Sequence, residues 1–416
     1  MSAGEAEASS LPLARNRDFR LLWVGQALSV LGSRTAWIAY PLLVLSLTDS
    51  AAKAGLVGFA SWLPVLLFGL PAGVVVDRVD RKRLMVACDC GRALVVATIP
   101  AALAVGRLSF SQIVAVAFIE RALATFFDPA ETGALRNLVP EKQLGEAIAR
   151  NESREYAAFL LGPPAGGALF TLGRALPFIV DAISYTASAI SLLFIRRPLQ
   201  QQSEARESAL LLGGISDGVR YVWRQPFLRT TAFVSGGANF VTNGVGLAAI
   251  IVAEQTLRAS GAEIGLMLTF AGLGGLAGSL AAPRLQAWLS PRQVIAVGTC
   301  TWTVLIPAMV FAPNASLLGG ILGLALSTAP PWNAVVGAYR IALTPDRLQG
   351  RVQSATSLFT QGAIAFGNLA AGLLLEATGR VATFAAFAAT MVLVGGIGTL
   401  TPAARATFAR ELAGGG

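Results

Sequence analysis

The stretch GVVVDRVDRKR, residues 73–83, joins two long apolar segments of the chain. Four of its last six residues are Lys or Arg, and such charges are costly to place in the hydrocarbon core of a bilayer. If the flanking segments span a membrane, the stretch lies on the cytoplasmic side, because short cytoplasmic loops carry the excess of basic residues. Gly73, which has no side chain, is expected to let its helix pack closely on a neighbour. The orientation of the other segments follows from this loop.

Composition defines the broad class of protein. Of the 416 residues, 54% are hydrophobic and only 13% are charged, whereas a typical soluble domain has about 25% charged residues. The 44 glycines are scattered through the apolar segments, where small residues let membrane helices approach one another. The composition therefore predicts a polytopic membrane protein.

Several other classes are disfavoured. The net charge of +9 does not indicate nucleic acid, because the basic residues punctuate the apolar segments instead of forming one face or arm. Histidine is absent, and the three cysteines (Cys88, Cys90 and Cys300) have no spaced partners, so no metal site or cofactor is expected. No phosphate-binding loop precedes a lysine, and no nucleophile–base pair stands out, so we expect neither a nucleotide-driven pump nor an enzyme.

The apolar segments are interpreted as about twelve membrane-spanning helices, each near the roughly 20 residues that a bilayer requires. The first six are expected near residues 19–46, 54–76, 84–106, 110–130, 149–172 and 175–195, and the second six near residues 228–253, 262–285, 292–312, 316–338, 352–377 and 381–400. The polar segment 196–226 is interpreted as a cytoplasmic linker with a short amphipathic helix around Ile215–Trp223. The predicted domains are thus two six-helix bundles, residues 1–195 and residues 227–416, the second with a short cytoplasmic tail.

The distribution of Lys and Arg supports this topology. On the proposed inner side there are 24, and on the outer side only five, with Arg34, Arg92 and Arg121 inside spans. Because basic residues favour the cytoplasmic loops, both termini are expected to be cytoplasmic.

An internal repeat occurs at an offset of 205 residues. Residues 73–76 map onto residues 278–281, LVPE at 138–141 maps onto LTPD at 343–346, and Gly162 and Gly167 map onto Gly367 and Gly372. Each pair occupies the same place in its own half. We therefore expect an all-α membrane protein built from two parallel six-helix repeats.

The loop at residues 73–83 resembles the signature G-x-L-A-D-R-x-G-R-K between the second and third helices of the major facilitator superfamily. The shared positions are Gly73, Asp77, Arg78, Arg81 and Lys82, while Asp80 stands in place of the second glycine. The resemblance implies that these residues form a gate on the cytoplasmic side. Asp77 is expected near the start of the eleventh span, around Gly350–Ser354, where the positive end of a helix dipole favours a carboxylate.

The fifth span contains GPPAGG, residues 162–167, which is similar to the G-P-x-x-G-G core of antiporter-type exporters of that superfamily through Gly162, Pro163, Gly166 and Gly167. The segments FFDPA (126–130), LVPEKQL (138–144) and VDAISY (180–185) resemble the drug-efflux subgroup that includes macrolide-efflux and enterobactin-exporter proteins. The fourth-helix signature R-x-x-q-G is matched only by Arg121, with Thr125 in place of its glycine.

Without histidine, a proton carrier in this chain has to be a carboxylate inside a span. Our hypothesis is that Glu120, in the middle of the fourth span, is the protonatable coupling residue, with Arg34 or Arg121 as its counter-ion; a permanent structural ion pair is the alternative. Asp89 and Arg92 are three residues apart and are expected to form a structural or gating pair, with substrate contact as the alternative.

For the other polar and small residues, both a structural and a functional role stay open. Asp181 is expected to make a helix–helix hydrogen bond, with ligand binding as the alternative. The prolines and glycines of residues 162–167 predict a bent, closely packed seam between the halves, with ordinary packing as the alternative. Candidates for contact with an amphipathic substrate, with interfacial or packing roles as the alternative for each, are Trp37, Asn239, Asn243, Trp332 and Asn333.

Taken with the resemblance, these features predict a secondary active transporter in the cytoplasmic (inner) membrane. Its expected partners are a small-molecule substrate, protons and the lipid bilayer. We expect a monomer that exports a hydrophobic or amphipathic small molecule, such as an antibiotic-like drug or a siderophore, in exchange for protons. A lysophospholipid flippase or an importer of the same fold is the alternative.

Overall fold

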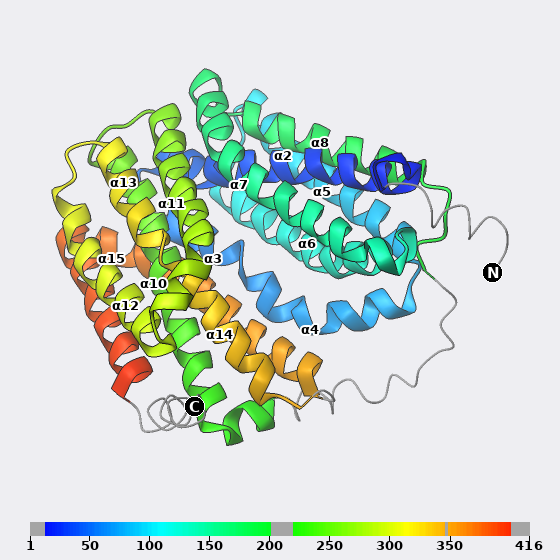
Figure 1. Cartoon of the computed structure of the whole chain (residues 1–416). Helices are drawn as coiled ribbons and strands as arrows, with labels where there is room; N and C mark the ends of the chain where they lie inside the picture. Colours follow the sequence, from blue (N-terminus) through cyan, green and yellow to red (C-terminus); the bar gives the residue numbers. More distant parts are fainter. Residues whose placement is uncertain (1–12, 201–218, 346–347, 401–416) are drawn as a thin grey trace. The chain divides into compact units, whose positions relative to one another are not determined.

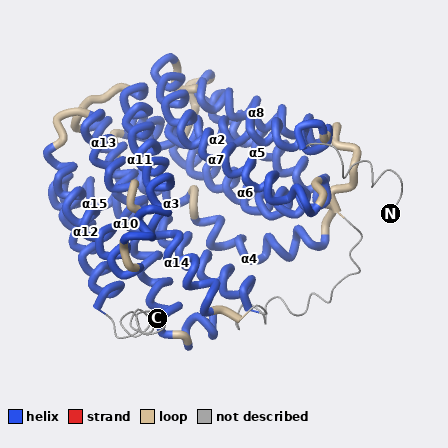
Figure 2. Tube along the Cα trace, in the orientation of Figure 1, coloured by secondary structure: helices blue, strands red, loops and turns tan. Residues whose placement is uncertain are grey.

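The computed structural model describes residues 13–200, 219–345 and 348–400 (Figure 1). Figure 2 shows helices and loops, and no strand, within these ranges. The predicted all-α class is therefore confirmed for the described part of the chain. Of the short helix expected around Ile215–Trp223, only residues 219–223 lie in that part, and they are helical.

The helices of the first half follow one another through short connections. They are α2 (Arg17–Thr48), α3 (Ala51–Ala60), α4 (Leu63–Arg78), α5 (Arg81–Ala104), α6 (Phe110–Leu138), α7 (Leu144–Leu172) and α8 (Leu176–Leu193), with 3₁₀ turns η1 (Leu13–Arg15) and η2 (Glu141–Gln143).

The helices of the second half repeat this pattern. They are α10 (Pro226–Gln255), α11 (Gly261–Trp288), α12 (Pro291–Ala308), α13 (Ala315–Leu326), α14 (Ala329–Leu343) and α15 (Gln349–Leu400), with one 3₁₀ turn, η3 (Met309–Phe311).

These elements account for the twelve expected spans. Ten of the described stretches are long and apolar enough to cross a membrane, counting α3 with α4 and α13 with α14 as single spans. The eleventh is α7, whose first turns are charged and whose second half is apolar. The twelfth arises because α15 breaks at Gly379, whose φ of 74° is outside the helical region. That break falls between the predicted spans 352–377 and 381–400.

Polar caps begin many of these helices. The side chains of Ser50, Asp80, Ser109, Ser260, Ser290 and Asn314 each accept a hydrogen bond from a backbone N–H in the first turn of the helix that follows. Such caps satisfy donors that have no partner within the helix. Asp80 thus has a local role that the second glycine of the superfamily signature could not perform.

The chain divides into two compact units, of which only the described parts are discussed. One contains residues 1–40 and 67–208, and the other contains residues 41–66 and 209–416. In the first unit α5 packs on α6 and α8, and these helices run alongside α7 in Figure 1. In the second unit α15 packs on α10, α12 and α3. The predicted domain boundaries at the 196–226 linker stay a prediction.

Equivalent glycines make equivalent contacts in the two repeats. A Cβ atom added at Gly162 of α7 would lie 2.4 Å from Cβ of Arg34 in α2. At the 205-residue offset, a Cβ atom added at Gly367 of α15 would lie 2.2 Å from the carbonyl oxygen of Phe240 in α10. In each half, therefore, the fifth span touches the first span through a glycine that a larger residue could not replace without movement.

Candidate functional site

Glu120 lies inside the first unit, where two tyrosines donate to its carboxylate. The Tyr40 hydroxyl, from α2, donates to Oε2, and the Tyr185 hydroxyl, from α8, donates to Oε1 at 2.9 Å. Both tyrosines are buried, with 7% and 1% of their surface exposed. The predicted coupling residue is thus held by three helices of one unit, in a setting that suits an acceptor-only carboxylate.

The structure corrects one predicted counter-ion of Glu120. Nη2 of Arg34 lies 3.5 Å from Oε2 of Glu155 in α7, and no described ion pair joins Arg34 to Glu120. The reason is depth along α2: Tyr40 touches Glu120, and the six residues from Arg34 to Tyr40 correspond to about 9 Å of helix rise. Arg121 is close enough for its charge to act on Glu120, so it stays a candidate.

Asp89 and Arg92 form the buried ion pair that their spacing in α5 predicts. Nη2 of Arg92 donates to Oδ1 of Asp89, and the other carboxylate oxygen accepts from Ser188 of α8 at 2.6 Å. The Arg92 guanidinium also lies over two aromatic rings, 4.5 Å from the Phe127 centroid and 4.4 Å from the Tyr185 centroid. The pair therefore ties α5 to α6 and α8 beside the Glu120 site.

A second charged network connects α6, α7 and α2. Nη1 of Arg154 donates to Oε1 of Glu131 at 2.9 Å, and Nη2 of Arg154 is 3.4 Å from Oε1 of Glu155, the partner of Arg34. The sequence reasoning missed this network. Arg154 and Glu155 lie in the first turns of the predicted fifth span, 149–172, although Arg154 was counted among the 24 inner Lys and Arg residues. Their place in the span was the signal that could have marked them.

All of these intramembrane charges belong to the first repeat. At the 205-residue offset, Asp89 and Arg92 correspond to valines, Glu120 and Asp181 to alanines, Arg121 to Leu326 and Arg154 to Phe359. The Arg34–Glu155 ion pair corresponds to a neutral contact, in which Nδ2 of Asn239 donates to the Thr360 carbonyl at 3.1 Å. The two repeats therefore share a backbone plan but differ in the polarity of their interiors.

The residues of the predicted gate separate into distinct local roles. The Asp77 carboxylate is exposed and lies 3.7 Å from Nη2 of Arg81, one turn further on. Nζ of Lys82 donates to the carbonyls of Leu193 and Ile195 at 3.0 and 2.7 Å, so it caps the carboxyl end of α8. Arg78 ends α4. The expected approach of Asp77 to residues 350–354 stays a prediction.

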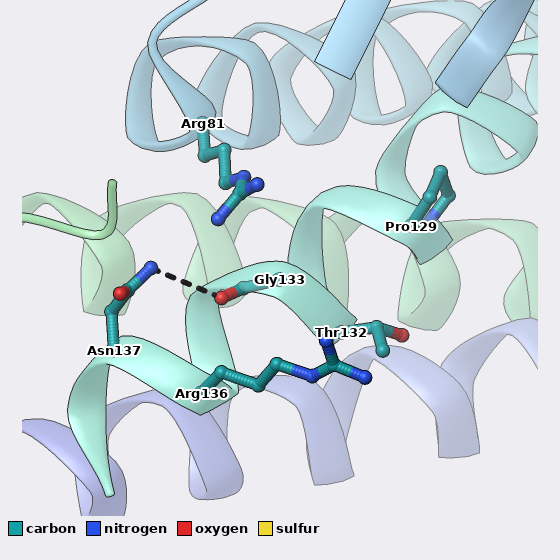
Figure 3. Close-up of a pocket in the computed structure, with 6 residues that line it drawn as sticks. All are labelled: Arg81, Pro129, Thr132, Gly133, Arg136 and Asn137. Atoms are coloured by element: carbon teal, nitrogen blue, oxygen red, sulfur yellow. Dashed lines mark hydrogen bonds between the residues drawn. The ribbon is translucent and has the colours of Figure 1, made fainter. Parts of the chain in front are cut away.

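Arg81 borders a pocket of about 320 Å³ whose other lining residues come from one face of α6 (Figure 3). Its guanidinium lies against Gly133, where an added Cβ atom would be 2.7 Å from Cζ. Asn137 donates to the Gly133 carbonyl at 3.2 Å on the same face. By contrast, no described atom lies within 4 Å of a Cβ atom added at Gly73, so the close packing expected there is not found.

The antiporter-like motif packs within the first unit. A Cβ atom added at Gly166 would lie 2.2 Å from the Thr35 carbonyl oxygen of α2, and Gly162 faces Arg34 in the same way. Pro163 lies within α7, which is continuous through the motif, and Pro163 and Gly167 are both buried. The structure thus shows a close seam between the fifth and first spans of one half, while the seam between the halves stays a prediction. Two glycines explain the close seam, because they let two helix backbones touch.

The candidate substrate contacts divide into exposed and packed residues. Trp37 is 42% exposed and Asn333 is also exposed. Trp332 is only 6% exposed and packs against Gly298, which agrees with the packing alternative; its contact with substrate stays a prediction. A large apolar ring is stabilised by burial against a neighbouring helix. Asn243, which is half-buried, donates to the Asn239 carbonyl at 3.0 Å.

The helical layout, the long apolar spans and the charged interior are those of a multi-pass membrane protein. The sequence profile of a family described as transmembrane secretion effector matches residues 8–410. The chain belongs to this family, which is part of the major facilitator superfamily.

Characterised relatives have similar sequences. The multidrug efflux pump Tap of Mycolicibacterium fortuitum is 30% identical over 392 residues, which cover 90% of this chain and 93% of the relative. Macrolide efflux protein A of Streptococcus pyogenes is 26% identical over 185 residues, 43% of this chain and 45% of the relative.

Solved structures have a similar fold. A bacterial homologue of the human lysosomal transporter Spinster, inward-facing and unoccupied, has a TM-score of 0.73 at 16% identity, covering 95% of this chain and 98% of its own. An inward-facing bacterial homologue of the iron transporter ferroportin has a TM-score of 0.71 at 17% identity, covering 93% and 98%. At these identities the likeness concerns the fold alone.

Proposed function

We propose that the protein exports amphipathic small molecules across the cytoplasmic membrane in exchange for protons. Export of drug-like molecules is supported by the names of its relatives, a multidrug efflux pump and a macrolide efflux protein. Exchange for protons is supported by the chain's own residues, since a carboxylate inside a span is the group available to carry a proton where histidine is absent.

The observation that carries the proposal is the setting of Glu120. Two buried hydroxyls hold its carboxylate, and the nearby Arg92 is already paired with Asp89. An ionisable residue inside a membrane segment is costly to keep, and it marks ion or proton pathways in transporters. The second repeat has an alanine at the equivalent position, so the fold itself does not require the carboxylate.

Evidence for a substrate path comes from charged side chains that lie within the membrane-spanning helices and are nevertheless exposed. Arg34 and Glu155 have 39% and 41% of their side-chain surface exposed, and Asp128 is exposed one helix away. Trp37 is exposed one turn beyond Arg34 on α2. Because exposed charges at this depth avoid lipid, we infer that these residues face water and substrate. Aromatic and charged groups together suit an amphipathic molecule.

Transport requires the site to open alternately to each side of the membrane. We propose that Asp77 and Arg81 secure the inner gate, on the side that the positive-inside rule makes cytoplasmic. Both termini would then be cytoplasmic, and the protein would act as a monomer. A lysophospholipid flippase or an importer of the same fold is the competing function, and it predicts uptake where export predicts extrusion.

The test uses cells that express the protein and are loaded with ethidium or a macrolide. Wild-type cells should extrude the probe, and a protonophore should abolish the extrusion. Glu120→Gln should behave like the protonophore, whereas Glu146→Gln, which removes an exposed carboxylate paired with Arg150 on α7, should behave like wild type. Extrusion by wild type that the protonophore leaves intact, or uptake of lysophospholipid without probe extrusion, would overturn the proposal.

A further inference from the structure

A second carboxylate lies close to Glu120 without the donors that surround it. Asp181, on α8, is 0% exposed, and its Oδ2 atom has no hydrogen-bond partner among the described residues. The Ser184 hydroxyl is 3.5 Å from Oδ1, but its single hydrogen is directed to the Asp181 carbonyl at 2.8 Å. An ionised carboxylate only accepts hydrogen bonds, and at this site Oδ2 has no donor to accept from.

The space around Asp181 is closed by α2. A Cβ atom added at Gly32 would lie 2.2 Å from Oγ of Ser184 and 3.1 Å from Oδ1 of Asp181, so the backbone of α2 packs directly on both side chains. The Ser33 hydroxyl faces Asp181 from the same helix. The carboxyl group is therefore enclosed by protein, where an unpaired charge is expensive.

The charged groups nearby are already engaged. On α5, Arg92 is paired with Asp89; on α6, Glu120 accepts from two tyrosines, and Arg121 lies near the carboxylates of both Glu120 and Asp128. No described ion pair includes Asp181. Two ionised carboxylates in this cluster would repel one another without a cation for the second, and a buried charge without a partner is strongly disfavoured.

We propose that Asp181 is a second proton-binding site, which holds a proton in this conformation while Glu120 is ionised. The contrast in donors distinguishes the two groups. Both oxygens of Glu120 accept from a tyrosine hydroxyl, whereas Oδ2 of Asp181 has no partner among the described residues, and the two serine hydroxyls near Asp181 donate to backbone carbonyls. The use of this proton in transport rests on the proposed function, but the protonation of Asp181 does not.

A chain of hydroxyls connects the two carboxyl groups. Tyr185 donates to Oε1 of Glu120 at 2.9 Å, and its oxygen lies 2.8 Å from Oγ of Ser33, which faces Asp181. Asp181 gives its proton to Ser33, Ser33 passes its own hydrogen to Tyr185, and Tyr185 passes its hydrogen to Glu120. Asp181 is then ionised and Glu120 neutral, with no net gain or loss of protons. The Ser33 hydroxyl, which donates to the Ser29 carbonyl at 2.9 Å, turns away from it for this step.

Infrared spectroscopy of the purified full-length protein in liposomes at neutral pH tests the proton directly. Wild type should show the carbonyl stretch of a protonated carboxylic acid, sensitive to exchange into heavy water. The band should be lost in Asp181→Asn, moved in Asp181→Glu, which keeps a carboxyl group in a folded protein, and kept in Glu120→Gln. A wild-type spectrum without the band, or a band that survives in Asp181→Asn, would overturn the proposal.

Ethidium transport separates this proposal from the proposed function. Asp181→Asn should lose efflux driven by a pH gradient while it binds ethidium as tightly as wild type, and Asp181→Glu should restore part of that efflux. Full gradient-driven efflux by Asp181→Asn would count against the second site. Wild-type efflux that ignores the gradient would instead remove the proposed function, and the infrared band would still report on Asp181.

Discussion

Replacing Arg92 with methionine removes the cation of the buried pair in α5 while keeping a side chain of comparable length. Asp89, 0% exposed, would then be left without its partner, and Arg92 itself is only 5% exposed. Removing one member of a buried pair costs about 3–5 kcal/mol. The contacts with two aromatic rings are worth about 0.5–2 kcal/mol each, but such terms do not simply add. We expect the free energy of unfolding to fall by about 3–5 kcal/mol, roughly two to three and a half powers of ten in the unfolding equilibrium.

Unfolding by SDS in mixed micelles, followed by tryptophan fluorescence, measures this loss. The matched control is Arg150→Met on α7, which breaks an exposed pair with Glu146 and should cost less than about 1 kcal/mol. Combining Arg92→Met with Asp89→Leu should recover much of the loss, because two apolar residues of similar volume can replace a buried pair. The reasoning would be refuted if Arg92→Met lowered the free energy of unfolding no more than the control does. It would also be refuted if the loss in the double variant equalled the sum of the losses in Arg92→Met and Asp89→Leu alone.

Other residues give predictions of the same kind. Gly166→Ala should lower the free energy of unfolding by about 1–3 kcal/mol, since its methyl group meets a carbonyl of α2, whereas Gly69→Ala in open surroundings should change it by no more than about 1 kcal/mol. Trp332→Ala should cost about 3–5 kcal/mol in the same assay, while Asn333→Ala should leave stability unchanged and alter drug susceptibility in cells; the reverse pattern would place the tryptophan in the substrate path. Asp77→Asn should lower the maximal transport rate with substrate affinity intact, and a loss confined to affinity would contradict its role in the inner gate.

Much of the fold was predictable because the hydropathy and the length of each apolar segment are local properties of the sequence. Residue type and spacing were enough to predict the apolar spans, the internal repeat and the break between the eleventh and twelfth spans. Helix ends were less accurate: α6 continues to Leu138, beyond the predicted 130. Hydropathy falls where charges such as Glu131 begin, but these residues remain good helix formers and the hydrogen-bond ladder continues.

The candidate site was predictable only in part, because partners depend on depth and on the face of each helix. Glu120 could be selected as an acid inside a span, but nothing in the sequence indicates that Tyr40 and Tyr185 meet it. Placing Arg34 beside Glu120 was an error of about six residues along α2, or about 9 Å. Lys82 shows the same limit, since its contact with the end of α8 depends on the path of residues more than a hundred positions away.

Substrate-driven proton movement tests the central role of Glu120 most directly. Liposomes containing the purified protein and a pH-sensitive dye would receive an ethidium gradient, with no pH gradient imposed. Wild type and the exposed-site control Glu146→Gln should move protons against the direction of ethidium, and Glu120→Gln should move none while still binding ethidium. Equal proton movement by Glu120→Gln and wild type would contradict the assignment of the exchanged proton to Glu120.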